Sequence, residues 1–354
     1  MSTAGPPQGA RAPLGGSDAH ATSERGDNVR APRTRVQRRP VHGVLLLDKP
    51  IGLSSNQALQ KAKWLLRADK AGHTGTLDPL ATGVLPLCFG AATKFSQLHL
   101  DADKRYVATA LLGVRTATGD AEGEVIERSD VNVSHADIER VQARFTGPIR
   151  QVPPMHSALK KDGKALYEYA RQGIEVERAP RDVVVHDLTI SAEAGFETNH
   201  RVRIEAGVSK GTYIRTLGED IGIALGCGAH LTSLRRVRTG PFAAERCVTL
   251  EALEAMDEAE RLALLLPVEA LVEDHVPVTL EPDDAGRFLS GLRRRGTWPD
   301  APAVAVFGRA PDAFLGTAHV KGGELIPSRL LSPADIQQIH LQHQAALAAS
   351  TTPS

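Results

Sequence analysis

The stretch that organises this sequence is Gly72-His73-Thr74-Gly75-Thr76-Leu77-Asp78-Pro79-Leu80-Ala81-Thr82-Gly83. It holds three glycines, one histidine and one carboxylate within twelve residues, and regular secondary structure is predicted on both sides of it. Glycine adopts backbone conformations closed to other residues, and it also lets another chain approach closely. Asp78 followed by Pro79 is typical of a helix start, with a carboxylate N-cap and proline at the first helical position. The alternative is that Asp78 performs chemistry, and the local sequence leaves both interpretations open.

Length and composition indicate an ordinary globular protein. The 354 residues suffice for two domains with a well-buried core in the larger one. The 42 basic residues equal the 42 acidic residues, so a nucleic-acid partner would have to bind a segregated basic face. The three cysteines lie far apart, which favours a reducing compartment without disulfides or a zinc site. No apolar run is long enough to span a bilayer and no signal peptide is evident, so the chain is expected to be cytoplasmic.

Residues 1–40 are predicted to form a disordered basic tail. They contain almost no large apolar side chains, so they cannot bury enough surface to offset their ordering entropy. The segment from Arg30 to Arg39 has five arginines and no acid. It is either a weak electrostatic arm for RNA or a solvated tail.

An α+β domain with a mixed, mainly antiparallel sheet is predicted over residues 41–266. Residues 43–50 are a short apolar run stopped by proline, typical of a buried strand. Capping boxes at Ser54 and Thr216 predict helix starts. Strands are close enough in sequence to pair antiparallel, and 124–128 is expected to pair with 106–113. The other expected elements are strands at 84–89, 183–192 and 201–208, helices at 134–145 and 165–172, and an irregular connection at 147–154.

A small β-rich domain is predicted over residues 267–340. The segment from Glu251 to Asp284 contains eleven acids and a single basic residue, Arg261. It is interpreted as a solvated helical linker that would repel a phosphate backbone. Short β-like segments occur at 276–280, 303–307 and 314–320, and residues 341–354 are expected to fray.

Several common reaction classes lack their sequence motifs. There is no G-x-G-x-x-G after a strand, no Walker loop, no H-E-x-x-H, no C-x-x-C and no G-x-S-x-G. Redox, nucleotide-hydrolysis, zinc and serine-hydrolase chemistry therefore have no support. One glycine-framed carboxylate, two tyrosines and several arginines remain, which suits nucleophilic-carboxylate or general-base chemistry without a cofactor.

Several ordered motifs closely resemble those of the TruB-type tRNA pseudouridine synthases. They are residues 43–50, 72–86, 103–106 and 209–215, with further matches at 153–160 and 234–236. The resemblance implies conversion of uridine 55 in the T loop of tRNA to pseudouridine by base flipping, without a cofactor or metal. It implies tRNA as the partner, no membrane, no obligate protein partner and a monomer. It also implies that a PUA-like RNA-binding domain follows the catalytic one.

The resemblance assigns the essential aspartate to Asp78, which must be ionised. A neighbouring arginine would favour that form by opposite charge, and Arg215 is the candidate. Tyr213 and Arg215 precede the expected cap at Thr216, so extended geometry would point both side chains one way. Tyr106 resembles the tyrosine that stacks on the flipped uracil, although its strand position alone would indicate a core residue. Tyr213 resembles a second tyrosine of the substrate pocket.

Three further residues are implied to form or support the substrate pocket. His73 resembles the histidine that inserts into the T loop as the target base leaves, and Leu234 resembles an apolar pocket wall. Lys49 resembles a pocket-supporting residue, with a solvated lysine at a strand end as the alternative. Enzymes that act on a base must extract it from its stack, which requires such a pocket. The glycines of the organising stretch are expected to let a nucleotide approach the backbone closely.

Contacts to the RNA backbone are predicted from basic clusters. Lys160, Lys161, Arg235 and Arg236 are the predicted contacts, and Lys164, Arg238 and Arg293 to Arg295 extend the clusters. Opposed to one acidic segment, the clusters predict a one-sided basic face.

Two alternatives differ from a free-standing isomerase. One is a tRNA-folding chaperone for which binding matters more than modification. The other is guide-dependent modification, and the free-standing form is favoured because the chain carries no obvious lysine-rich tails.

Overall fold

The computed structural model describes residues 37–309 and 312–350. The predicted tail lies outside the described residues except for residues 37–40. Arg39 is already bonded there, because its N–H donates to the Arg67 carbonyl (2.9 Å) and its carbonyl accepts from the Asp69 N–H (3.0 Å). Regular contacts therefore begin before Val41, where the sequence predicts the first ordered residue.

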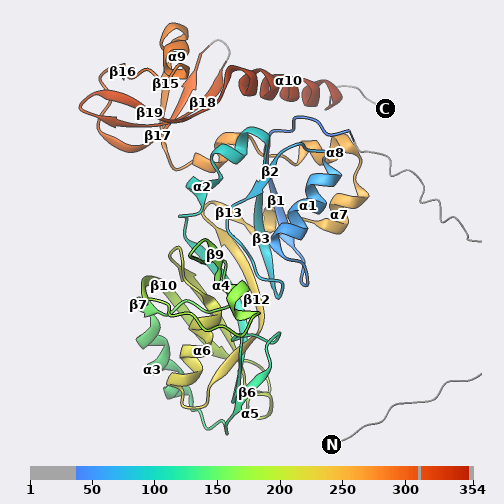
Figure 1. The fold of residues 1–354 in the computed structure, drawn as a ribbon, viewed down its shortest axis with the longest axis vertical. Helices are drawn as coiled ribbons and strands as arrows, with labels where there is room; N and C mark the ends of the chain where they lie inside the picture. Colours follow the sequence, from blue (N-terminus) through green and yellow to red (C-terminus); the bar gives the residue numbers. More distant parts are fainter. Residues whose placement is uncertain (1–36, 310–311, 351–354) are drawn as a thin grey trace, which may run out of the picture. The chain divides into compact units, whose positions relative to one another are not determined.

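The larger part of the chain is built on a ten-stranded mixed sheet (Figure 1). Its strands are β1 (Gly43–Lys49), β2 (Ala71–His73), β3 (Ala81–Phe89), β4 (Lys104–Leu112), β7 (Gly147–Gln151), β10 (Arg181–Ala192), β11 (Arg201–Val208), β12 (Ala229–Thr239), β13 (Phe242–Ala243) and β14 (Val248–Thr249). The main path runs β14-β1-β3-β12-β4-β11-β10-β7. The pairs β1–β14 and β3–β12 are parallel and the others are antiparallel. The predicted α+β class and mainly antiparallel sheet are confirmed.

Three helices of eleven residues each share one hydrophobic core with this sheet. They are α1 (Ser55–Leu65), α3 (His135–Phe145) and α6 (Ile214–Ala224). Helices α1 and α3 begin with capping boxes at Ser54 and Ser134, so both predicted starts are confirmed. Leu59, Ile138 and Leu217 bring these helices into the core, and each such buried side chain stabilises the fold by roughly 1.5–3 kcal/mol.

Two predictions for the strands are wrong. Strand β6 (Val125–Arg128) pairs with β5 (Val114–Thr116) and not with β4, because Gly113, with a φ of 83°, ends β4 and turns the chain. Residues 147–151, expected to be irregular, form β7 at the end of the main path, paired with β10. Pro148 is tolerated because an edge strand leaves some N–H positions unpaired.

The predicted capping box at Thr216 is also wrong. Helix α6 begins at Ile214, and Tyr213 is its N-cap without a side-chain capping bond. The side chain of Gln151 accepts from the Tyr213 N–H (3.0 Å) and donates to the Tyr213 carbonyl (3.3 Å). This tertiary contact from β7 holds the backbone extended immediately before the helix, so the helix starts there.

The C-terminal part contains a separate five-stranded sheet ordered β15-β17-β18-β19-β16. Its elements are β15 (Val276–Leu280), α9 (Pro282–Leu289), β16 (Arg294–Arg295), β17 (Ala301–Gly308), β18 (Ala313–Lys321), β19 (Glu324–Leu330) and α10 (Pro333–Ser350). The three predicted β-like segments are confirmed. Residues 341–350, expected to fray, continue helix α10, and residues 351–354 lie outside the described residues.

The acidic segment is not a solvated linker throughout. It forms α7 (Leu250–Ala255), α8 (Glu258–Ala263) and the 3-10 helix η3 (Val268–Val272). The apolar side chains of η3 are buried in a cluster that also contains Phe95 and Phe314, whose ring centroids are 5.2 Å apart. Because this cluster joins residues of both sheets, the segment is part of a packed junction.

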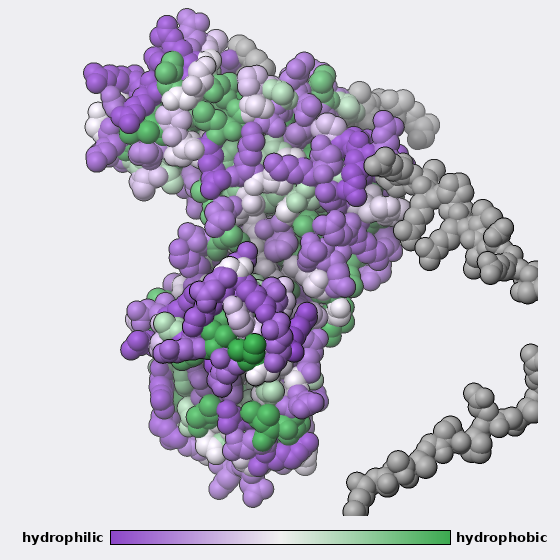
Figure 2. All heavy atoms as spheres, viewed as in Figure 1, coloured by the Kyte–Doolittle hydropathy of each residue, from purple (hydrophilic) through white to green (hydrophobic). Residues whose placement is uncertain are grey.

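The remaining elements are short. They are η1 (Gly90–Lys94), α2 (Ser96–His99), β8 (Lys160–Lys161), β9 (Lys164–Ala165), α4 (Leu166–Ala170), α5 (Phe196–Asn199) and η2 (Ala244–Arg246). The helix predicted at 165–172 corresponds to α4. No helix in the described ranges is long and apolar enough to cross a membrane. Hydrophilic residues cover most of the face shown in Figure 2, with smaller hydrophobic patches between them.

Candidate active site

Asp78 lies in the loop between β2 and β3, not at a helix start. Residues 76–78 have no regular structure, and the Asp78 carbonyl accepts from the Ala81 N–H (3.1 Å) to close a turn. The N-cap interpretation is therefore wrong. The buried Ser55 hydroxyl accepts from the Leu77 N–H (2.7 Å) and donates to the Leu77 carbonyl (3.0 Å). These two hydrogen bonds to one residue fix the backbone immediately before Asp78.

Lys49 supports the same turn from the end of β1. Its side chain is fully buried, and Nζ donates to the carbonyls of Pro50 (2.8 Å), Leu53 (2.6 Å) and Pro79 (3.4 Å). Burial lowers the pKa of Lys49 to about 8, and the negative charge of Asp78 opposes this shift. The alternative of a solvated strand-end lysine is therefore wrong.

Arg215 meets Asp78 from the first turn of α6. Its side chain is 5% exposed, and Nη2 lies 2.9 Å from Asp78 Oδ2. The guanidinium also donates to the carbonyls of Thr118 (3.1 Å) and His156 (2.7 Å). The predicted partnership is present, although the premise for it is wrong. Arg215 is helical, and only Tyr213 has extended backbone geometry.

Two carboxylates that the sequence analysis did not single out lie close to this pair. Asp120 Oδ2 is 3.5 Å from Arg215 Nη1, and the Asp120 side chain is 3% exposed. The pKa of Glu122 is raised, first by burial and then by the negative charges of Asp120 and Asp78. The signal for both was present in Thr118-Gly119-Asp120-Ala121-Glu122-Gly123, where two acids lie between glycines in the connection between two expected strands.

The surroundings of Asp78 act on its pKa in opposite directions. Burial raises the pKa, Arg215 lowers it by its charge and hydrogen bond, and Asp120 raises it again, with a net upward direction. The side chain still keeps 38% of its exposure. Asp78 is thus a reachable carboxylate, held on one side by a buried cation.

Sheet register brings two predicted pocket residues to the strand that follows Asp78. Leu234 on β12 pairs with Ala81 on β3 and with Ala108 on β4. Tyr106 precedes Ala108 by two positions, so both side chains point to the same face of β4. Tyr106 is half-buried against the core and Leu234 is 7% exposed. Tyr213 enters from the start of α6, where burial raises the pKa of its hydroxyl.

His73 occupies the end of β2, where it pairs with Leu87. Burial first, and then the charge of Arg236, lower the pKa of His73, so the ring is neutral at neutral pH. Among the described residues, its buried Nδ1 has no hydrogen-bond partner. The ring therefore retains unused hydrogen-bonding capacity beside Asp78's loop.

Comparison with known proteins identifies the family. Residues 63–214 match the TruB family pseudouridylate synthase N-terminal domain, and residues 215–273 match the tRNA pseudouridylate synthase B C-terminal domain. A tRNA pseudouridine synthase B from Verminephrobacter eiseniae (strain EF01-2) is 66% identical over 312 residues, covering 87% of this chain and 94% of that protein. The chain belongs to the TruB family of pseudouridylate synthases. It is therefore an enzyme of the isomerase class.

A second TruB relative and one solved structure are also similar to this chain. A tRNA pseudouridine synthase B from Ralstonia nicotianae (strain ATCC BAA-1114 / GMI1000) is 56% identical over 304 residues, covering 84% of this chain and 97% of that protein. A chain in the crystal structure of a Cbf5-Nop10-Gar1 complex superposes with a TM-score of 0.62 at 28% identity. The superposed region covers 85% of this chain and 87% of that chain. The two TruB domain matches end at residue 273, before the five-stranded sheet.

The predicted RNA-contacting residues of this TruB enzyme do not form one set. Lys160 and Lys161 are exposed on β8. Arg235 is 41% exposed and bonds both carboxylate oxygens of Asp48 (2.9 and 2.7 Å). Arg236 is 1% exposed, so its prediction as a surface contact to RNA is wrong. Adjacent strand residues point to opposite faces, and the register of β12 turns Arg236 inward.

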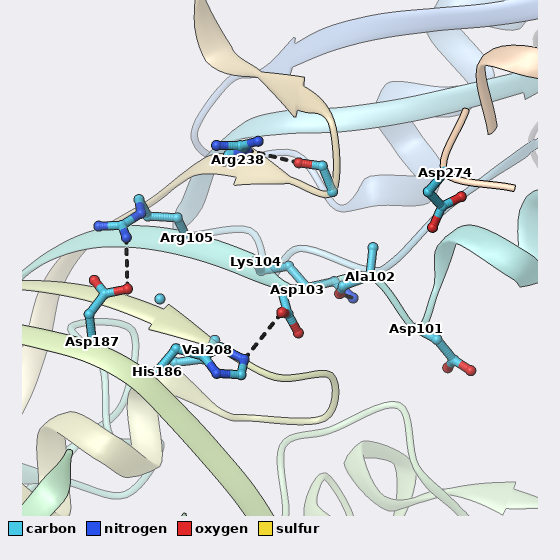
Figure 3. A pocket seen from close by; sticks show the side chains of 12 residues that line it. Asp101, Ala102, Asp103, Lys104, Arg105, His186, Asp187, Val208, Arg238 and Asp274 are labelled. Atoms are coloured by element: carbon cyan, nitrogen blue, oxygen red, sulfur yellow. Dashed lines mark hydrogen bonds and ion pairs between the residues drawn. The ribbon is translucent and has the colours of Figure 1, made fainter. Parts of the chain in front are cut away.

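A cavity of about 600 Å³ opens beside the start of β4, apart from Asp78 (Figure 3). Acidic and basic side chains alternate on its walls, with Arg105 paired to Asp187 (2.7 Å) and His186 to Asp103 (3.2 Å). Within the described part of the chain, no three His, Cys, Asp or Glu side chains are placed to hold a metal ion.

Proposed function

We propose that this enzyme converts uridine 55 in the T loop of tRNA to pseudouridine, with Asp78 as its essential carboxylate. The observation that carries the proposal is the Asp78–Arg215 ion pair of 2.9 Å, which fits an ionised carboxylate waiting for substrate. Relatives named tRNA pseudouridine synthase B support tRNA as the substrate class, and such an enzyme would act in the cytoplasm.

The chemistry explains why a bare carboxylate is needed. The N1–C1′ bond breaks, the uracil rotates, and a C5–C1′ bond forms while C5 loses its proton and N1 gains one. Attack on C1′, attack on the ring and proton abstraction to a glycal all start from ionised Asp78. Arg215 stabilises that form, since an opposite charge within hydrogen-bond distance favours ionisation.

The neighbouring side chains suit an extracted base. Tyr106 offers an aromatic ring for stacking and Leu234 an apolar wall. His73, neutral and with a buried unpaired nitrogen, is proposed to fill the space that the base leaves in the T loop. Tyr213 and Lys49 complete and support the pocket.

Release of tritium from tRNA transcript labelled at uracil C5 tests the proposal directly. Asp78→Asn should abolish release while tRNA binding persists, because the amide keeps the size of the side chain and removes its charge. Asp48→Asn is the matched control, since Asp48 pairs with Arg235, whose side chain points to the face of β12 opposite Leu234 and Arg236. Product formation by Asp78→Asn at the rate of the unsubstituted enzyme would refute the assignment.

Position and autonomy require two further measurements. A transcript with cytidine at position 55 should release no tritium above background from labelled uracils elsewhere. Purified protein alone should modify the normal transcript, because we propose that no guide RNA or protein partner is needed. Activity that appears only after adding cell RNA would contradict this second part.

We propose that the five-stranded sheet is a PUA-like domain that contacts tRNA away from the target base. Arg293 and Arg295 extend from it with 64% and 88% of their side chains exposed, although both pair with Glu324. Replacing both with glutamine should weaken tRNA affinity and flatten its salt dependence, with unchanged turnover at saturating tRNA. A loss of turnover at unchanged affinity would refute this role.

A further inference from the structure

Arg236 is one of the largest fully buried side chains of the protein. A buried cation is costly unless it is paired, and most are paired with carboxylates. Across residues 37–309 and 312–350, no carboxylate lies within 4.0 Å of the Arg236 guanidinium. Its bonds go instead to backbone carbonyl groups, so its location needs a separate explanation.

Those carbonyl groups lie on both sides of Asp78 in the sequence. Nε donates to the Val84 carbonyl (2.8 Å), and Nη2 donates to the Gly75 carbonyl (3.2 Å). The planar fork of the guanidinium therefore ties the start of the loop that carries Asp78 to strand β3, which follows that loop. A lysine, with one nitrogen at the end of a flexible stem, could not occupy both donor positions at once.

One glycine of the organising stretch is explained by the approach of the β12 backbone. A Cβ on Gly83 would lie 2.1 Å from the Arg236 carbonyl oxygen, and the φ of Gly83 is +98°. A Cβ on Gly75 would make only ordinary van der Waals contact with Arg236 Nη1 (3.4 Å), so its φ of +85° is what favours glycine there. The expectation that Gly83 admits a nucleotide is therefore replaced, since the chain approaching it is β12.

Sheet register connects Arg236 to the other side of the site. It pairs with Gly83 on β3 and with Tyr106 on β4. Directly opposite residues in an antiparallel pair point to the same face, so Arg236 and Tyr106 share one face. A single side chain thus lies between the loop of Asp78 and the strand of Tyr106.

We infer that Arg236 is a positioning residue, which clamps Gly75, in the loop of Asp78, to Val84 in β3 so that Asp78 meets Arg215 next to the strand of Tyr106. The inference rests on the proposed role of Asp78. Arg236 itself touches neither substrate nor the reacting atoms. Its buried charge also acts on His73, whose pKa is lowered by burial first and by Arg236 second.

Measurements of single-turnover tritium release and of tRNA binding distinguish a positioning role of Arg236 from a direct contact with an RNA phosphate. Arg236→Gln should lower the rate at saturating tRNA by about 10–100-fold, because small misplacement of a reacting group costs rates of that order. Affinity should change less than threefold, and the slope of affinity against salt should stay the same. A phosphate contact predicts the reverse, with the salt slope falling by about one and the rate unchanged. That result would overturn the inference.

Matched variants make the outcome decisive. Arg203→Gln, which breaks an exposed pair with Glu205 on β11, should keep the rate of the unsubstituted enzyme. Arg236→Lys keeps the charge and loses the fork, so it should lose about tenfold in rate. If Arg236→Gln does not fold, the lysine variant decides, since full activity there would overturn the clamp. Cooperative thermal unfolding at a temperature near that of the unsubstituted enzyme would show that it is folded.

One readout is independent of activity. Removing a nearby positive charge should raise the pKa of His73 in Arg236→Gln, measured by NMR titration, and Arg236→Lys should leave it lowered. An unchanged His73 pKa in the glutamine variant would overturn the placement of Arg236 beside the loop. Failure of the proposed function would appear differently, as normal product formation by Asp78→Asn.

Discussion

Arg215 and Arg236 are both buried next to Asp78's loop, yet they are satisfied by different groups. Arg215 has two carboxylates, Asp78 at 2.9 Å and Asp120 at 3.5 Å, and two carbonyls. The bonds of Arg236 recorded in the structure go to carbonyls alone. Carboxylates titrate and carbonyls do not, so the region of Arg215 should respond to pH. The region of Arg236 should respond to a change in the shape of the side chain at position 236.

The largest expected effect comes from removing the paired arginine. Arg215→Met leaves Asp120 buried without its cation, which should cost about 3–5 kcal/mol in the free energy of unfolding at neutral pH. Tritium release should fall by about 10³-fold, a value typical of lost charge stabilisation in a site. Urea unfolding at pH 7.5 and pH 5 measures the first effect.

The sign of the pH dependence follows from the same pairing. Arg215 lowers the pKa of Asp78, so without it the folded-state pKa of Asp78 rises further above the unfolded value. The folded state then binds more protons, so its stability is lost as pH rises through these values. The deficit of Arg215→Met should shrink at pH 5, and an equal deficit at both pH values would contradict the pairing.

The next effect is an acid limb in the rate of the unsubstituted enzyme. Because the net direction of the Asp78 pKa is upward, the rate should begin to fall above the ordinary carboxyl range. It should fall about tenfold per pH unit below that pKa. Asp120→Asn should move the limb to lower pH, since Asp120 is among the groups that raise the pKa. Arg236→Lys should leave the pH at which the rate falls unchanged. A change in that pH would show that Arg236, like Arg215, controls the ionisation of Asp78.

Lys49 offers a smaller effect with a distinct pH window. Lys49→Met leaves three carbonyls without their donor, a cost of about 1–3 kcal/mol for each buried group left unpaired, partly offset by removing a buried charge. The pKa of Lys49 is lowered from 10.5 to about 8, so the unfolded state binds more protons between these values. Stability of the unsubstituted enzyme should therefore rise with pH through that window. The methionine variant should show a smaller rise in chemical unfolding experiments, because Lys104, whose pKa burial also lowers to about 8, keeps its own contribution.

The smallest effect is expected at the exposed pair. Arg235→Gln breaks a bidentate contact with Asp48, but the arginine is 41% exposed. Exposed pairs contribute at most about 1 kcal/mol and are screened by salt. The thermal unfolding temperature should change little. If it fell as much in Arg235→Gln as in Arg236→Gln, the exposed and buried faces of β12 would contribute equally to stability.

Local signals predicted much of the scaffold correctly. The capping box at Ser54 and the helix start at Ser134 need only a few neighbouring residues, and the apolar run of β1 identifies a buried strand without reference to its partners. The start of α6 was misplaced because Gln151, sixty-two positions earlier, determines the backbone at Tyr213. Likewise, composition alone indicated a linker where Val268 to Val272 pack into a shared core.

The sequence by itself determined the family motifs, the mainly antiparallel α+β class and the candidates Asp78, Arg215 and Tyr106. It could not distinguish Arg235 from Arg236, because the two are chemically identical neighbours and a strand points them to opposite faces. Only the register of β12 between β3 and β4 decided which arginine is exposed and which is buried. The tertiary structure also brought Asp120 to Arg215 and assigned Gly83 of the organising stretch to the close approach of β12. These contacts join residues far apart in the chain, so no local pattern could specify them.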